Sequence, residues 1–162
     1  MNEATQQLQN NAPDDPEQAA RQRAMAVLAQ ASGQELAEAW DTWPDRPAVS
    51  PVRGPETGLV MVRGRIGGGG APFNFGEATV TRATVKLSTG LVGHAYALGA
   101  DKEKVRHAAI FDALWQDGAT RSAVEEHLVA PVRQRLEADD ARRRDETAAT
   151  KVDFFTMVRG ED

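Results

Sequence analysis

The hydrophobic period of the chain changes twice along its length. Residues 16–40 and 101–150 carry helical patterns, whereas residues 58–99 show the alternation that is typical of strands. We therefore expect an α+β fold, in which an antiparallel sheet of three to four strands is flanked by N-terminal and C-terminal helices. The length of 162 residues suits a single core. Residues 16–162 are predicted to form one α+β domain with an apolar C-terminal tail, after a disordered extension of residues 1–15.

Capping residues predict where the helices begin. Asp15 is expected to cap a first helix, whose buried side carries Met25, Val27 and Leu28. Capping boxes are expected to start two further helices, one at Ser32 with Glu35 and one at Ser122 with Glu125. The latter helix is predicted to be interrupted before Pro131, ahead of a polar helix over residues 132–150.

A main core helix is predicted between Asp101 and Gln116. His107, Ile110, Phe111, Leu114 and Trp115 share one broad sector of this helix, and Lys102, Arg106 and Gln116 lie opposite. We expect the first set to pack on the rest of the protein.

Three strands are predicted over residues 59–62, 78–87 and 91–98. The last two flank a tight-turn signal at residues 88–90, so they are expected to pair as an antiparallel hairpin. Ahead of them, four prolines between Pro44 and Pro55 predict an irregular connector.

The strand region is locally basic, although the net charge of the chain is −5. Alternation puts Val60 and Val62 on one face of the first strand, and Arg63 and Arg65 on the other. Together with Arg82 from the next strand, these arginines are predicted to form a basic docking face. It would meet an acidic partner or screen a polyphosphate, and an ordinary solvated face is the alternative.

An independent active site is not indicated. Cysteine is absent, which excludes thiolate metal sites, and His94, His107 and His127 lie far apart, so no metal is predicted. Adjacent acidic residues on the helices diverge and do not make an acid–base pair. We therefore expect no catalytic residue and no cofactor bound by this chain alone.

Composition also limits location and partners. The negative net charge argues against nucleic acid, and no apolar run reaches the ~20 residues that span a bilayer. Residues 1–15 lack the basic start and apolar stretch of a secretory signal. A soluble, cytoplasmic protein without nucleic-acid or membrane partners is predicted.

The last residues of the chain are unusually apolar for a segment that follows a polar helix. Phe154, Phe155, Met157 and Val158, with Arg159, are predicted to form a partner interface. The alternative is that this tail docks on the protein's own core as an edge strand.

Several motifs resemble one protein family. Residues 152–160, with the sequence Val-Asp-Phe-Phe-Thr-Met-Val-Arg-Gly, are similar to the C-terminal signature of the G subunit of the bacterial carbon-phosphorus lyase core complex. Residues 56–60 leading into 65–68, residues 76–83, and Asp101-Lys102 resemble the same family. The similarity covers roughly residues 23–160.

The resemblance implies a required but non-catalytic subunit that works with the other subunits of that complex. The complex, a transferase, uses ATP as a substrate and displaces adenine with an alkylphosphonate, giving a ribose 1-phosphonate 5-triphosphate in phosphonate catabolism. A radical iron-sulfur subunit acts later. The alternative function is a free-standing phosphate- or nucleotide-binding module, built from the glycine-rich residues 64–70 and the three arginines.

Overall fold

A computed structural model describes residues 15–65 and 69–150, and it confirms the predicted α+β fold. The elements are α2 (Pro16–Gln30), α3 (Gly33–Asp41), β1 (Val49–Arg65), β2 (Pro72–Leu87), β3 (Val92–Leu98), α4 (Lys102–Gln116), α5 (Arg121–Val124), the π-helical turn η1 (Glu125–Val129) and α6 (Ala130–Ala149). The strands form one antiparallel sheet in the order β1-β2-β3. The C-terminal tail, and the N-terminal extension apart from Asp15, lie outside the described residues.

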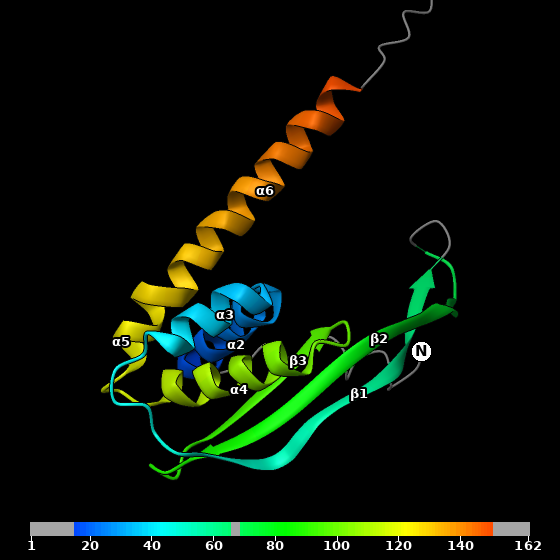
Figure 1. Cartoon of the computed structure of the whole chain (residues 1–162). Coiled ribbons are helices and arrows are strands. Elements are labelled where there is room, and N and C mark those ends of the chain that lie inside the picture. Colours follow the sequence, from blue (N-terminus) through cyan, green and yellow to red (C-terminus); the bar gives the residue numbers. More distant parts are fainter. Residues whose placement is uncertain (1–14, 66–68, 151–162) are drawn as a thin grey trace, which may run out of the picture.

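The helices lie on one side of the sheet and leave its other face without a helical cover (Figure 1). Helix α4 makes most of the helical contact with β2 and β3, and Gly93 of β3 permits the close approach. A Cβ atom at Gly93 would lie 2.6 Å from the backbone nitrogen of Ala113 and 2.8 Å from its Cβ. Only a glycine therefore fits at this contact.

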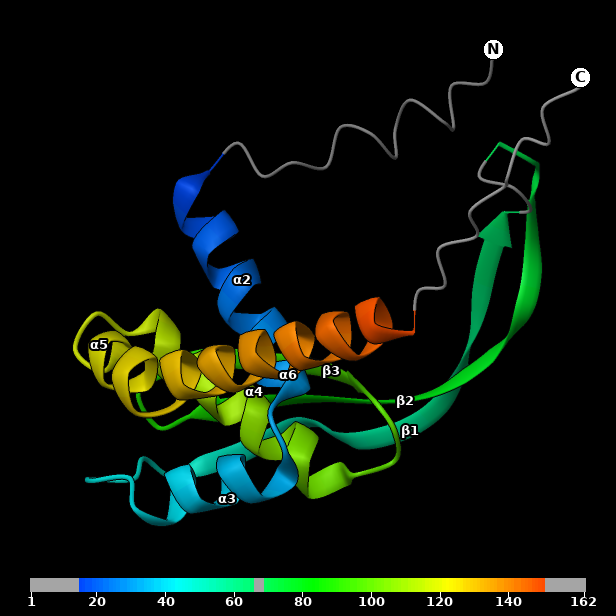
Figure 2. The same cartoon turned by 90° about the horizontal axis from the view of Figure 1, so that it is seen from above.

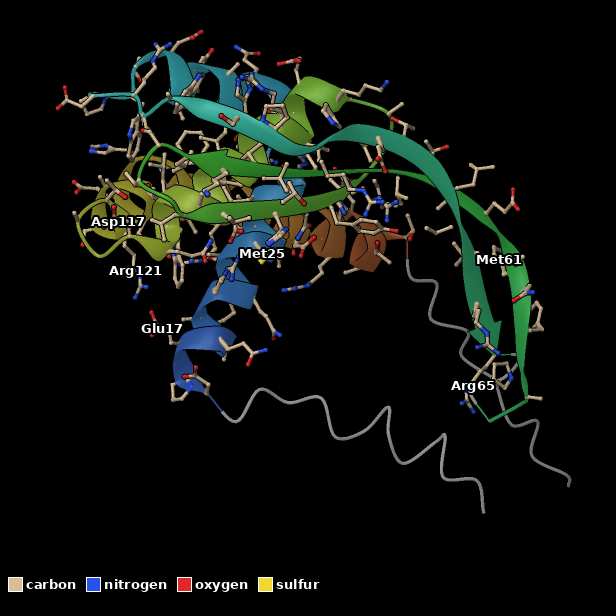
Figure 3. All side chains as sticks on the ribbon, turned by 90° about the horizontal axis from the view of Figure 1, so that it is seen from below. Glu17, Met25, Met61, Arg65, Asp117 and Arg121 are labelled. Carbon is tan, nitrogen blue, oxygen red and sulfur yellow. The ribbon has the colours of Figure 1, made fainter. Side chains whose placement is uncertain are left out.

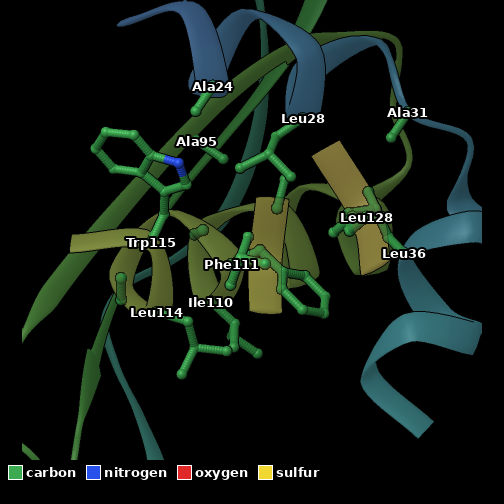
Figure 4. Packing of buried hydrophobic residues seen from close by; sticks show 14 of the residues in the cluster. Ala24, Leu28, Ala31, Leu36, Ala95, Ile110, Phe111, Leu114, Trp115 and Leu128 are labelled. Carbon is green, nitrogen blue, oxygen red and sulfur yellow. The ribbon is translucent and has the colours of Figure 1, made fainter. Parts of the chain in front are cut away.

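Helix α4 forms the centre of the core (Figure 4). Every residue from 108 to 115 is buried, because the sheet covers one side of the helix and α2, α3 and α5 cover the others. The predicted apolar sector is therefore only part of the buried surface. Gln116, which the sequence places opposite that sector, is half-buried and donates to the carbonyl of Val92 at 2.9 Å.

The first two helices begin directly after their predicted capping residues, Asp15 and Ser32. The Asp15 side chain accepts from the Glu17 amide at 2.9 Å, and Ser32 and Glu35 form a complete capping box. The buried residues of α2 are Ala24 and Leu28, whereas Met25 and Val27 are only half-buried. Helix α4 is capped in the same way by Asp101, which accepts from the Lys104 amide at 2.9 Å.

The prediction that the four prolines exclude regular structure was wrong for Pro51 and Pro55. Strand β1 begins at Val49 and contains both Pro51 and Pro55. It is an edge strand that pairs with β2 alone, so a missing amide can face away from the sheet. The register also shifts between Pro51 and Arg53 and between Arg53 and Glu56, which absorbs the irregularity.

The capping box predicted at Ser122 was also wrong, as was the interruption before Pro131. Helix α5 follows Thr120 without a side-chain cap, and Glu125 instead accepts from the Trp115 indole nitrogen at 2.6 Å. The chain then continues through η1 into α6. A π-helical turn is wider than an α-helical turn, which relieves the clash between a proline ring and the preceding turn.

A buried carboxylate joins three elements of the fold. Asp112 of α4, whose side chain is 1% exposed, accepts from Arg21 of α2 through both guanidinium nitrogens, Nε at 3.0 Å and Nη2 at 2.7 Å. Its Oδ2 atom also accepts from the backbone amide of His94 in β3 at 2.8 Å. This group therefore fixes α2 against α4 and occupies part of the free edge of the sheet.

Candidate functional site

The two longest strands continue past the end of the third strand. Pairing between β2 and β3 ends at Val80 and Leu98, whereas β1 and β2 remain paired as far as Arg65 and Pro72. The extra length forms a two-stranded ribbon, here defined as residues 59–65 and 72–79, which projects from the body (Figures 1 and 2). No third strand and no helix of the described part of the chain covers this ribbon.

The helix-free face of the sheet can be followed from β3 onto the ribbon. Because Gly93 faces α4, alternation places Tyr96 and Leu98 on the opposite face. Leu98 pairs with Val80, which pairs with Gly58, and cross-strand partners share a face. Val60 and Val62 continue this face along β1.

A bulge in β2 adds two aromatic residues to the same face. The register passes from Val62–Gly76 to Arg63–Asn74, so Phe75 is the extra residue. A Cβ atom at Gly64, which shares its face with Val62, would lie 3.9 Å from the Phe73 ring and from the Phe75 Cβ atom. The two phenylalanine rings contact each other edge to face, with centroids 6.4 Å apart.

These residues make a continuous surface that we call the apolar stripe. Its members are Tyr96, Leu98, Val60, Val62, Phe73 and Phe75. Phe75 is 76% exposed and Leu98 is 74% exposed, although both have large apolar side chains. Water-exposed apolar surface of this extent on a small protein is typical of a protein interface.

Polar residues border the stripe at the end where all three strands are paired. Glu56, Arg82 and Tyr96 line a shallow groove of about 220 Å³. The Arg82 guanidinium donates to Glu56 at 3.1 and 3.2 Å, and with Arg53 it lowers the pKa of that carboxyl below its usual value. An apolar centre with a charged rim is the usual composition of a docking surface.

The three arginines of the predicted basic face do not gather at one place. Arg82 pairs with Glu56 on the face of the apolar stripe, whereas Arg63 and Arg65 alternate with Val62 and lie on the other face of the ribbon. Arg63 lies seven residues after Glu56 along β1, so the two are about 23 Å apart along the strand. Figure 3 shows Arg65 near the tip of the ribbon, beyond Met61. The docking role of these arginines stays a prediction.

The three histidines also remain apart, on β3, α4 and η1. His94 contacts Thr84 at 3.1 Å, and burial lowers the pKa of His107. Within residues 15–65 and 69–150, no group of three metal-binding side chains comes together. Over the same residues, no helix is long and apolar enough to cross a membrane.

Three of the adjacent acidic residues, Glu125, Asp139 and Asp140, are engaged in ion pairs. Asp139 contacts Arg142 at 2.9 Å, and Asp140 contacts Arg143 at 3.7 Å. The Arg135 side chain of α6 donates from Nε to Glu35 of α3 at 2.7 Å, which joins the two helices. This hydrogen bond is the main reason that the pKa of Glu35 is lowered.

The predicted interface residues Phe154, Phe155, Met157, Val158 and Arg159 lie outside the described residues, so their role stays a prediction. The sequence analysis missed the apolar stripe. Phe73 and Phe75, spaced two residues apart, were its available signal. That signal does not reveal that the ribbon extends past β3.

Comparison with known proteins gives two findings. The family described as "Phosphonate metabolism protein PhnG" matches residues 19–160. A protein of Rhizobium meliloti (strain 1021), named "Alpha-D-ribose 1-methylphosphonate 5-triphosphate synthase subunit PhnG", is 63% identical over 149 residues, which cover 92% of this chain and 95% of that protein.

Proposed function

This chain belongs to the PhnG family of phosphonate metabolism proteins, and from this membership we propose that it is a required, non-catalytic subunit of a ribose 1-methylphosphonate 5-triphosphate synthase. Its partners are the other subunits of the carbon-phosphorus lyase core complex. The complex uses ATP as a substrate and displaces adenine with an alkylphosphonate. The location proposed for this activity is the cytoplasm.

The apolar stripe is the observation that best supports a subunit role. It combines highly exposed large side chains with a projecting ribbon, and a partner subunit that covers it would remove this surface from water. We assign the stripe to the contact with a neighbouring subunit. The side chains of Phe75 and Leu98, the most exposed of the stripe, are expected to supply much of the binding energy.

The alternative of a free-standing nucleotide-binding module has less support. It requires Arg63, Arg65 and Arg82 to converge on one phosphate group, whereas Arg82 lies on the opposite face from the other two. The Arg82 side chain is also engaged with Glu56.

Substituting aspartate within the stripe tests the proposed contact. The double variant Phe75→Asp, Leu98→Asp is expected to weaken binding to the partner subunits on the order of 1,000-fold, because two buried hot-spot side chains at about 2 kcal/mol each contribute about 4 kcal/mol. Binding is measured by reconstitution from purified subunits at increasing concentration, and folding is checked by circular dichroism.

Val52→Asp is the matched control. Val52 is exposed and apolar but lies in β1 outside the stripe, so its replacement should leave assembly unchanged. Normal assembly of the double variant would show that the stripe is not a subunit contact.

A further inference from the structure

The free edge of β3 is only partly occupied. The backbone amide of Leu87 donates to the Leu91 carbonyl, and the amide of Gly99 donates to the Thr79 carbonyl. These two bonds show which residues of β3 direct their backbone groups toward β2. Alternate residues of β3 therefore direct their backbone groups away from β2. Val92 and His94 belong to this outward set, and the α4 side chains Gln116 and Asp112 bond to them.

Tyr96 and Leu98 continue the outward set, but no comparable partner reaches their backbone groups within the described part of the chain. Open amide and carbonyl groups on an edge strand are a template for another strand. The edge of β3 next to Tyr96 and Leu98 is therefore open to a further strand.

A groove lies beside this open edge. It encloses about 550 Å³ between α2, β3 and α6. Its apolar lining includes Ala26, Ala29 and Leu136, and its basic lining includes Lys104 and Arg143. A strand added at the edge would place every second side chain in this groove.

We propose that the C-terminal tail of this same chain, residues 154–158, pairs with the open edge of β3 as the fourth strand of the sheet. Arg143, which lines the groove, lies seven residues before Thr150, or about 10 Å along α6. Residues 151–153, when extended, span about 10 Å back toward the groove. The tail is thus long enough to bring Phe154 and the residues after it to the edge.

The composition of the tail fits this place. Its apolar residues match the apolar lining, and Asp153 comes at the point where the chain passes Arg143. In a strand, Phe154, Thr156 and Val158 share one face, and Phe155 and Met157 share the other. One set fills the groove, and the other lies next to Tyr96 and Leu98 and extends the apolar stripe. This last consequence rests on the proposed subunit contact.

Amide hydrogen exchange in the isolated full-length chain tests the fourth strand. The comparison is a chain that ends at Thr150, which keeps the buried core of the described residues because that core lies within residues 24–132. The Tyr96 and Leu98 amides are expected to exchange at least ~10-fold more slowly in the full-length chain. The Ala95 and Ala97 amides face β2, so they should exchange alike in both chains and serve as the internal control.

A synthetic peptide of residues 151–162 is expected to restore the protection of Tyr96 and Leu98 in the shortened chain. In the full-length chain, the amides of Phe155 and Thr156 point in opposite directions, so one of the variants Phe155→Pro and Thr156→Pro should abolish this protection, whereas Thr156→Ala should preserve it. Equal exchange of the two amides in the full-length and shortened chains would overturn the proposal. Protection that rises with protein concentration would also overturn it, because the tail would then pair with a second copy. Neither result depends on assembly with other subunits, so the proposed function is tested separately.

Discussion

Replacing Gly93 with alanine is expected to prevent stable folding, lowering the free energy of unfolding by on the order of 4 kcal/mol or more. The new Cβ atom would lie 2.6 Å from the Ala113 nitrogen and would also meet the Ala109 carbonyl. Both are backbone atoms of α4, so no side-chain rotation relieves the clash. Helix α4 would have to move away from the sheet, and the core is built around that helix. Urea denaturation followed by circular dichroism measures the loss.

Gly58→Ala is the matched control in the same sheet. A Cβ atom at Gly58 meets nothing within 4 Å, so this variant should stay within about 0.5 kcal/mol of the unmodified chain. A Gly93→Ala protein with the stability of the Gly58→Ala protein would contradict the described packing of α4 on β3.

Replacing Arg21 with methionine is expected to lower the free energy of unfolding by about 3 kcal/mol. The substitution removes both hydrogen bonds to Asp112, whose side chain stays 1% exposed between α4 and β3. A buried carboxylate without its cation is strongly unfavourable. Arg21 itself is 30% exposed, so water reaches part of the site and the expected loss is at the lower end of the range for such pairs. The measurement is the denaturation midpoint at constant pH and salt.

Arg142→Met controls for the loss of an arginine as such. Arg142 pairs with Asp139 on the surface of α6, where its side chain is 68% exposed. A surface ion pair of this kind contributes less than about 1 kcal/mol. If the Arg21→Met and Arg142→Met chains unfold at the same denaturant concentration, the buried pair does not stabilise the fold as described.

The features that the sequence predicted correctly depend on neighbouring residues. Asp15, Ser32 and Asp101 cap helices through bonds that reach only two or three positions along the chain. The turn at residues 88–90 is equally local, and Gly90 takes the positive φ of 93° that it requires. Hydrogen bonds and turns between such near neighbours can be predicted from the sequence alone.

The features that were not predicted from the sequence depend on contacts between segments that are further apart in the chain. Pro51 is tolerated because β1 lies at the edge of the sheet, and strand order is set by the whole fold. Glu125 bonds to Trp115, ten residues away, instead of capping a helix. The apolar stripe required the bulge at Phe75 and the continuation of β1 and β2 to Arg65 and Pro72, beyond the predicted strands, and neither has a local signal.

Synthase turnover tests the central claim most directly, because the chain is proposed to be required for an activity that it does not perform. Conversion of ATP and methylphosphonate to the ribose 1-phosphonate product is measured with the chain alone, with the partner subunits alone, and with both together. We expect product only when the chain and its partners are combined. Turnover by the purified chain alone, or undiminished turnover by the partners without it, would contradict this account.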